Sequence, residues 1–243
     1  MRPLSARDLL RVWEVGEDQH PLDRALTLLA AACPELAWEE LAALSVGRRN
    51  ARLLALRERT CGPRLDCCVD CPECSEQLEF GVATSDLRAE EPPTGEEARE
   101  LVADGVALRF RLPDSRDLAS ILDLRDPAAA RAMLVRRCVL RAERDGAPVD
   151  AGELPAGVVA GLAERISEHD PQAEVLIDLR CPACGHAWQA LFDIASFLWG
   201  ELAARATRLL REVHDLACAY GWSQADILGM SARRRRFYLE MTA

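Results

Sequence analysis

The sequence predicts an α+β fold that is predominantly helical, with two β-hairpins between helical regions and a long helix near the C-terminal end. Three observations support this. Apolar residues recur at helical spacing in the first sixty residues and again after residue 193. Short stretches of strict apolar–polar alternation flank two Cys-Pro-x-Cys sequences, at 71–74 and 181–184. Nearly half of the residues (49%) are hydrophobic and 29% are charged, which is an ordinary balance for a globular protein.

The composition excludes several classes of protein. No apolar run approaches the roughly 20 residues that a membrane span needs. The first eight residues lack the apolar core of a signal peptide, so we expect folding in the cytoplasm. The net charge of −10 opposes general binding to nucleic acid, because phosphates attract a positive surface. Ten cysteines in such a chain favour metal binding or buried thiols over disulfides.

Residues 1–62 are predicted to form an N-terminal helical region. One helix is expected over 22–32, directly after Pro21, and a second over 36–46. Gly47 is expected to end the second helix, because glycine is common just beyond a helix C-terminus. An arginine-rich helix over 48–59 would place Leu53, Leu54 and Leu56 toward the core.

Residues 63–88 are predicted to form a first hairpin, and residues 89–170 an inserted strand and helix region. The hairpin strands are expected over 65–71 and 78–82. The insertion begins with an acidic, proline-bearing stretch over 89–97, which is typical of a solvated loop. It continues with a strand over 106–112, helices over 115–124, 127–143 and 155–168, and a turn at Asp145-Gly146.

Residues 171–243 are predicted to form a second hairpin, the long helix and a helical tail, in one compact unit with residues 63–88. Val175, Ile177 and Leu179 alternate ahead of the second Cys-Pro-x-Cys. Asp193 can cap a helix over 194–219, which Gly221 would end. Ser223 and Ser231 can cap two short helices in the tail.

The two Cys-Pro-x-Cys turns predict one structural zinc per chain. Each turn presents two thiolates to one metal, and two turns complete the closed tetrahedral site that structural zinc prefers. The predicted ligands are Cys71, Cys74, Cys181 and Cys184. Each turn lies between two alternating strands, so the two hairpins would form a split zinc ribbon with about a hundred residues inserted between its halves.

Two alternatives to this ligand set remain open. Cys68 lies three residues before Cys71, so Cys68 could replace Cys74 as a ligand. A Cys-x-x-Cys pair can also be a redox dithiol, although the βαβ context of such proteins is missing. His186 is expected on the surface of the second turn. Three further cysteines in helical patterns are expected to be small core residues: Cys33, Cys138 and Cys218.

No catalytic residues are expected. Four thiolates leave a zinc ion no open position for a substrate. The four histidines stand in no metalloenzyme pattern, and the sequence contains no phosphate-binding glycine loop and no nucleophile elbow.

The C-terminal tail is the expected partner-binding surface. Arginine beside aromatic residues is a common interface composition. The expected contact residues are Trp222, Arg233, Arg235 and Arg236, with Phe237, Tyr238 and Leu239 packed against the long helix. The alternative is that the tail only caps the core.

The C-terminal third resembles a known family. The residues that carry the resemblance are Asp170-Pro171, the turn from Cys181 to Gly185, Phe192-Asp193-Ile194, the segments 197–202 and 208–217, Tyr220-Gly221-Trp222-Ser223, Ile227-Leu228 and the segment 234–239. They resemble the T4-type baseplate hub assembly chaperones of contractile phage tails and phage-like extracellular injection systems. The resemblance extends from about residue 171 to the end, is plausible around 64–86 and is weak elsewhere.

The resemblance implies a non-enzymatic assembly factor or structural component of the baseplate hub. Its partners would be baseplate or hub proteins, and it could be incorporated into the assembled particle. The resemblance does not distinguish a phage from an injection system. Two other functions remain as alternatives: a zinc-ribbon adaptor that binds nucleic acid, and a dithiol redox protein.

Overall fold

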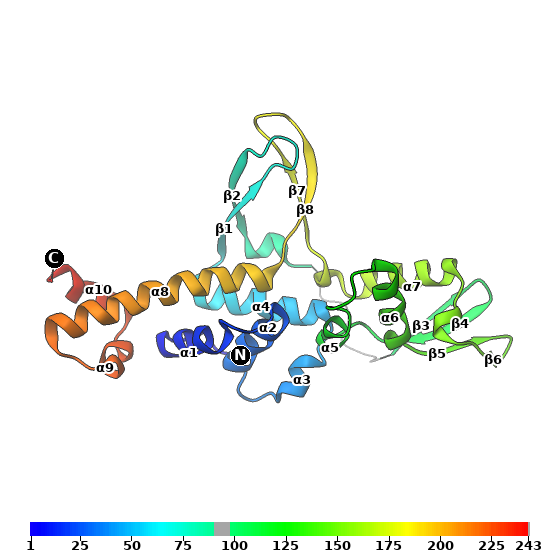
Figure 1. The fold of residues 1–243 in the computed structure, drawn as a ribbon, viewed down its shortest axis with the longest axis horizontal. Coiled ribbons are helices and arrows are strands. Elements are labelled where there is room, and N and C mark those ends of the chain that lie inside the picture. The colour runs from blue at the N-terminus through cyan, green and yellow to red at the C-terminus, as the bar shows by residue number, and fades with distance from the viewer. Residues whose placement is uncertain (90–97, 243) are drawn as a thin grey trace. The chain divides into compact units, whose positions relative to one another are not determined.

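The computed structural model describes residues 1–89 and 98–242, which form two compact units (Figure 1). Unit 1 contains residues 1–36 and 194–243, and unit 2 contains residues 37–193. The helices of unit 1 are α1 (Ala6–Gly16), α2 (Pro21–Ala32), α8 (Ile194–Tyr220), α9 (Gln224–Gly229) and α10 (Ala232–Glu240). Apart from Ala89, the predicted acidic loop lies outside the described residues.

Unit 2 contains helices and all the strands of the described part of the chain. The helices are α3 (Trp38–Ala42), α4 (Val46–Cys61), α5 (Ser115–Ala119), α6 (Pro127–Cys138), α7 (Ala156–His169) and the short 3₁₀ turns η1 (Thr84–Leu87), η2 (Ala151–Glu153) and η3 (Pro171–Ala173). The strands are β1 (Arg64–Asp70), β2 (Gln77–Ala83), β3 (Arg99–Ala103), β4 (Val106–Phe110), β5 (Val139–Arg144), β6 (Ala147–Pro148), β7 (Leu176–Arg180) and β8 (Ala187–Leu191). The protein is therefore a mixed helix and sheet structure with small antiparallel sheets and a long C-terminal helix.

The two units divide the chain differently from the four predicted segments. The first 36 residues join the long helix α8, because α1 and α2 both pack against it. The two hairpins β1–β2 and β7–β8 lie together in unit 2, with the inserted region between them in sequence.

Unit 1 is built on leucine contacts between α1, α2 and α8. Leu198 and Leu202 of α8 are fully buried, as are Leu28 and Leu29 of α2. Each such side chain contributes about 1.5–3 kcal/mol of hydrophobic stabilisation. Gly16, the last residue of α1, lies under the ring of Trp199, where a Cβ would come within 2.5 Å of the indole.

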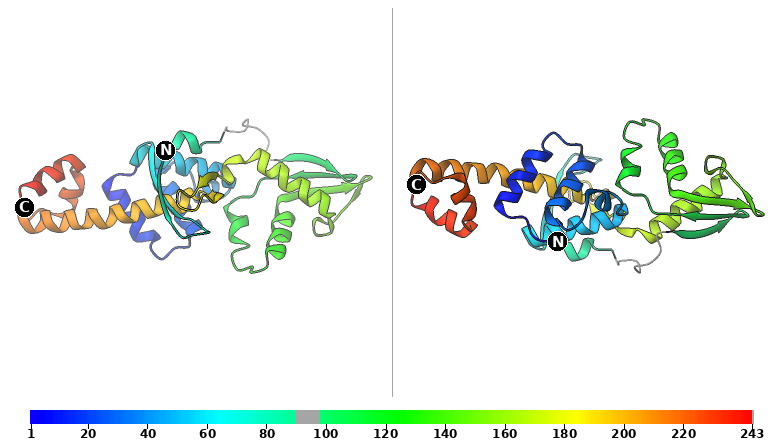
Figure 2. Two further views of the ribbon diagram at one scale, coloured as in Figure 1. Left: turned by 90° about the horizontal axis from the view of Figure 1, so that it is seen from above. Right: turned by 90° about the horizontal axis from the view of Figure 1, so that it is seen from below.

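The tail of unit 1 folds back along the end of α8 (Figure 2). Ser223 and Ser231 cap α9 and α10 as predicted, because their hydroxyls accept hydrogen bonds from the backbone N–H groups of Asp226 and Arg234. Gly221 ends α8 in a left-handed conformation (φ 67°), also as predicted. Cys218 is an exception, since it is exposed on α8 rather than buried as expected.

The inserted region of unit 2 has its own apolar core under a four-stranded sheet of order β3-β4-β5-β6. Val106, Leu108 and Phe110 of β4 point to the buried face, where they contact residues of α6 and α7. The Asp145-Gly146 turn forms as predicted, with both residues at positive φ, and Asp104-Gly105 makes the same turn between β3 and β4.

Three predicted helices of unit 2 have different bounds. The helix expected over 127–143 ends at Cys138, and the remainder is strand β5, because Val139 and the residues after it pair with β4. The helices expected over 36–46 and 115–124 shorten to α3 and α5. Gly47 does not end a helix: it lies in the first turn of α4, which Ser45 caps.

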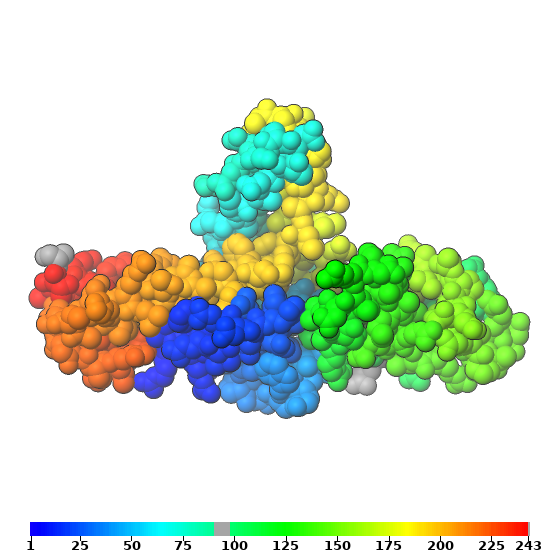
Figure 3. Space-filling model, in the orientation of Figure 1, coloured from blue at the N-terminus to red at the C-terminus, as the bar shows by residue number. Residues whose placement is uncertain are grey.

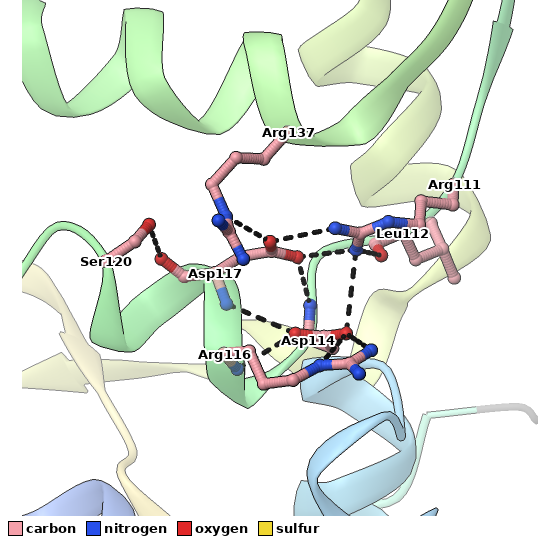
Figure 4. A network of polar contacts seen from close by, with 7 residues as sticks. All are labelled: Arg111, Leu112, Asp114, Arg116, Asp117, Ser120 and Arg137. Carbon is pink, nitrogen blue, oxygen red and sulfur yellow. Dashed lines mark hydrogen bonds and ion pairs between the residues drawn. The ribbon is translucent and has the colours of Figure 1, made fainter. Parts of the chain in front are cut away.

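A buried carboxylate fastens α5 to the sheet region (Figure 4). The Asp117 side chain is fully buried and accepts hydrogen bonds from Nη1 and Nη2 of Arg111, at 2.5 and 2.8 Å, and from Nε of Arg137 at 2.7 Å. Burial opposes the charge, but the Arg111 guanidinium, the backbone N–H of Asp114 and Arg137 together hold the pKa of Asp117 well below its usual range.

Candidate metal centre

Four cysteine sulfurs meet where hairpins β1–β2 and β7–β8 face each other. Cys71 and Cys74 lie in the turn between β1 and β2, and Cys181 and Cys184 lie in the turn between β7 and β8. The four Sγ atoms all lie within 4.8 Å of one another. Cys71 and Cys181 are buried, and Cys74 and Cys184 are exposed. The structure thus brings together the four predicted ligands from positions more than a hundred residues apart.

The sulfur spacing fits a tetrahedral metal. The Sγ atoms of Cys71 and Cys184 are 3.7 Å apart, and those of Cys74 and Cys181 are 3.6 Å apart. A disulfide would require about 2.05 Å. Four sulfurs at the usual Zn–S distance of about 2.3 Å lie about 3.8 Å apart at the corners of a tetrahedron. The donor set and its spacing therefore suit zinc.

The two turns have the same backbone geometry. The N–H of Cys71 donates to the carbonyl of Glu76 at 2.8 Å, and the N–H of Cys181 donates to the carbonyl of His186 at 2.8 Å. The residue after the second cysteine is left-handed in both turns: Ser75 has φ 59° and Gly185 has φ 77°. The two Cys-Pro-x-Cys turns are thus alike in backbone as well as in sequence.

Backbone N–H groups and neighbouring sulfurs set the ionisation of the thiols. The N–H groups of Cys184 and Ala183 are the main reason why the pKa of Cys181 falls to about 7. The N–H of Glu76 favours the Cys74 thiolate, but the adjacent sulfurs, Cys184 first, raise the pKa of Cys74 to about 12. Several thiolates so close together repel one another, and a bound cation would remove that repulsion.

Cys68 and His186 are not members of the cluster. Cys68 lies opposite Glu79 on the exposed face of β1–β2, so the structure brings Cys74, and not Cys68, to the other three sulfurs. The ring of His186 stacks on Trp188, with centroids 5.8 Å apart. Neither side chain belongs to the group of four sulfurs.

The two hairpins lie beside each other (Figures 1 and 3), and each has an alternation of half-buried and exposed side chains. The half-buried positions alternate along β1 and β2 and along β7 and β8. They include Val69, Leu78, Leu179 and Trp188, and in these four strands only Leu65 is fully buried. The apolar interior between the hairpins is thin, and the four sulfurs lie together at their tips.

A buried carboxylate that sequence reasoning missed holds the start of α4 to the segment before the second hairpin. Asp170 is 3% exposed and accepts hydrogen bonds from the hydroxyl of Ser45 and the N–H of Gly47, both at 2.8 Å. Burial raises the pKa of Asp170, and the two donors oppose that rise. A carboxylate at a helix N-terminus also interacts favourably with the helix dipole. Ser45 was a signal in the sequence, because serine often caps the start of a helix. It was placed instead near the end of the helix expected over 36–46.

Gln172 ties the two hairpin bases together. Its side-chain nitrogen donates to the carbonyl of Leu87 at 2.9 Å, and its side-chain oxygen accepts from the N–H of Ala89 at 2.8 Å. Leu87 follows the first hairpin, and Gln172 precedes the second. Polar contacts therefore join the hairpins at the base, and the four sulfurs lie together at the tip.

One predicted partner-binding residue is not at the surface. Arg235 is only 6% exposed, because its Nε donates to Glu212 of α8 at 2.8 Å and its Nη1 donates to the carbonyl of Met230 at 2.7 Å. Arg233 and Arg236 are exposed as expected, and Trp222 is half-buried. Phe237, which was expected inside, is 60% exposed, because Arg235 takes the inward position on α10.

Comparison with known proteins gives one family and no individual relatives. No curated protein and no solved structure matches the chain. The model of the family described as T4 bacteriophage base plate protein matches residues 4–199. The match covers the N-terminal and inserted regions, where the resemblance was weak, and leaves out most of the C-terminal segment, where it was strong. It spans most of the chain, and the protein therefore belongs to the T4 bacteriophage base plate protein family.

Proposed function

We propose that this protein acts without catalysis, as an assembly factor or structural component of the baseplate hub in a contractile phage tail or phage-like injection system. We further propose that one structural zinc per chain stabilises it. The observation that carries the proposal is the family match over residues 4–199, which includes both cysteine turns.

Membership of the family supports a role in the phage baseplate. The proposal of a role at the hub, one part of the baseplate, is more specific. The resemblance of the C-terminal residues to hub assembly chaperones favours it. A baseplate protein acts through its surfaces, so its partners would be other baseplate proteins. Among the described residues, no helix combines the length and the apolar character that crossing a membrane requires.

The four cysteines would hold the zinc. Bound zinc supplies four strong, charge-neutralising bonds to thiolates, and in small metal domains this is worth about 10 kcal/mol or more. Because the four thiolates fill a tetrahedral shell, a zinc ion here would have no position for a substrate. The chain's own contribution is to orient the sulfurs, with backbone N–H groups of each turn aimed at them.

The zinc proposal is tested by metal content in matched variants. Cys181→Ser should remove the bound zinc and lower the melting temperature of the hairpins by more than about 10 °C, because a loss of several kcal/mol shifts the midpoint by that much. Cys68→Ser is the matched control, since Cys68 is on the same hairpin outside the cluster. It should keep one zinc per chain by elemental mass spectrometry. Wild-type protein that is purified in zinc-containing medium and carries no metal would refute the proposal.

The assembly role is tested in the native host. A strain without this gene should accumulate tails that lack a complete baseplate, as seen by electron microscopy. The wild-type gene and the Cys68→Ser variant should restore assembly, whereas Cys181→Ser should not. Normal tails in the strain without the gene would exclude the proposed assembly role, but they would not contradict the zinc proposal.

A further inference from the structure

We propose that the exposed face of α10 is a docking surface for an acidic protein partner that carries an apolar pocket. The inference rests on the proposed function, since it names the chemistry of a baseplate partner. The surface is formed by Arg233, Arg236, Phe237 and Met241, and we call it the α10 face. Residues 200–243 lie beyond the family match, so this segment adds to what the family model covers.

The charge of this segment differs from the rest of the chain. Residues 200–243 contain seven arginines and five acidic residues, whereas the whole chain has 30 basic and 40 acidic residues. Four of the arginines are consecutive, from Arg233 to Arg236, and α10 has one carboxylate, Glu240. A cationic patch on an acidic protein is best matched by an acidic surface, which it would attract from a distance.

Exposed apolar side chains lie among these arginines. Phe237 is 60% exposed and Met241 is 64% exposed. Positions 233, 237 and 241 are four residues apart, so they follow one side of the helix. An exposed aromatic ring and a methionine flanked by arginine have the composition of an interface core, where such residues contribute most of the binding energy.

The helix that carries this face is held rigidly. Arg235 is fixed to Glu212 of α8 and to the carbonyl of Met230. Tyr238 packs edge-on against Trp222, with ring centroids 4.8 Å apart, and Trp222 stacks on Tyr220 at 4.5 Å. Little ordering is then needed on binding, which lowers its entropic cost. Trp222 thus supports the face rather than forming it.

The same observations favour a protein partner over a nucleic acid. Nucleic acid would gain from the arginines, but the net charge of −10 repels a polyanion. Phe237 and Met241 would gain little from a phosphate backbone, and they suit an apolar pocket in a protein surface.

The test uses purified baseplate proteins from the same tail gene cluster, applied one at a time to the immobilised full chain. We expect one acidic baseplate protein to bind the wild type. Arg233→Glu with Arg236→Glu should weaken binding by at least tenfold and reduce its salt dependence, and Phe237→Ser should weaken it by a similar factor. The matched control is Arg7→Glu with Arg11→Glu, which changes two exposed arginines of α1 by the same charge and should leave binding within about twofold.

The outcomes separate this inference from the proposed function. Equal binding of a baseplate protein by the wild type and by both α10 variants overturns the α10 face alone. No binding to any baseplate protein overturns both proposals. Two further measurements detect other occupants of the α10 face. Tight binding of a short DNA duplex at physiological salt would identify nucleic acid as the occupant, and self-association in sedimentation that the α10 variants abolish would identify a second copy of the chain. Either result would overturn the inference of an acidic baseplate partner. Unchanged melting of the variants excludes misfolding as the cause.

Discussion

The two parts of unit 2 keep their strands together in different ways. The inserted sheet β3–β6 buries Val106, Leu108 and Phe110 completely or almost completely under α6 and α7. The strands of the facing hairpins are mostly half-buried, and their tips meet at four sulfurs. The comparison teaches that the sheet region is stabilised by an apolar core, whereas the hairpins have polar contacts at one end and, at the other, four sulfurs that the proposed zinc would cross-link.

The largest expected effect is therefore that of metal removal, and it should be confined to the hairpins. In excess chelator, the backbone amides of β1, β2, β7 and β8 should lose protection from hydrogen exchange, because binding energy of about 10 kcal/mol is withdrawn from them. The amides of β4 and β5 should keep their protection. The measurement is hydrogen exchange read by mass spectrometry with and without chelator, and uniform loss across both regions would contradict the distinction.

The converse experiment is Phe110→Ala. Phe110 is fully buried in the sheet core, so the variant should lose about 3–5 kcal/mol of unfolding free energy in the inserted region. The hairpins should still bind one zinc, because their link does not pass through this core. Denaturant unfolding and metal content measure the two effects, and loss of zinc from the variant would show that the two regions fold as one.

The hairpin tips could be predicted from the sequence, whereas parts of the inserted sheet region could not. The four cysteines that come together were predictable, since the spacing of each turn is local and alternation marks the strands around it. Strand β5 was not predictable, because Val139 to Arg144 continues a helical pattern and becomes a strand only by pairing with β4. Asp170 was missed for a similar reason: its partners, Ser45 and Gly47, lie more than 120 residues away.

The tail shows the limit of local patterns in another way. Each of its two helix caps depends only on a serine and the backbone N–H three positions later, and both caps were predicted. The inward position on α10 depends on Glu212 of another helix, which attracts Arg235 and leaves Phe237 outside. A run of four arginines before an aromatic residue does not reveal which of the five side chains is buried.

A smaller effect is expected from the charge network of the sheet region. Asp117→Asn should cost about 3 kcal/mol at pH 7, because it removes the buried negative charge that faces Arg111 and Arg137. Asp123→Asn, at an exposed position in the same region, is the control and should have little effect.

The network also predicts a pH dependence. The folded pKa of Asp117 is below its ordinary value of 3.8, so its contribution is present above about pH 4 and is lost as the pH falls further. The difference in unfolding free energy between the wild type and Asp117→Asn should therefore shrink in acid. A difference that stays constant from pH 7 to pH 3 would show that the carboxylate charge is not what stabilises this site.

The smallest expected effect compares the two cysteine turns with each other. Ser75 and Gly185 occupy the same left-handed position, where a side chain costs about 1 kcal/mol. Gly185→Ala should weaken zinc binding by up to about fivefold through strain alone, since a Cβ there would contact nothing within 4 Å. Ser75→Gly should strengthen zinc binding by a similar factor, because it relieves that strain. Competition with a calibrated chelator measures both affinities. If both variants weakened zinc binding, the Ser75 side chain would be stabilising its turn, and the two halves of the site would not be equivalent.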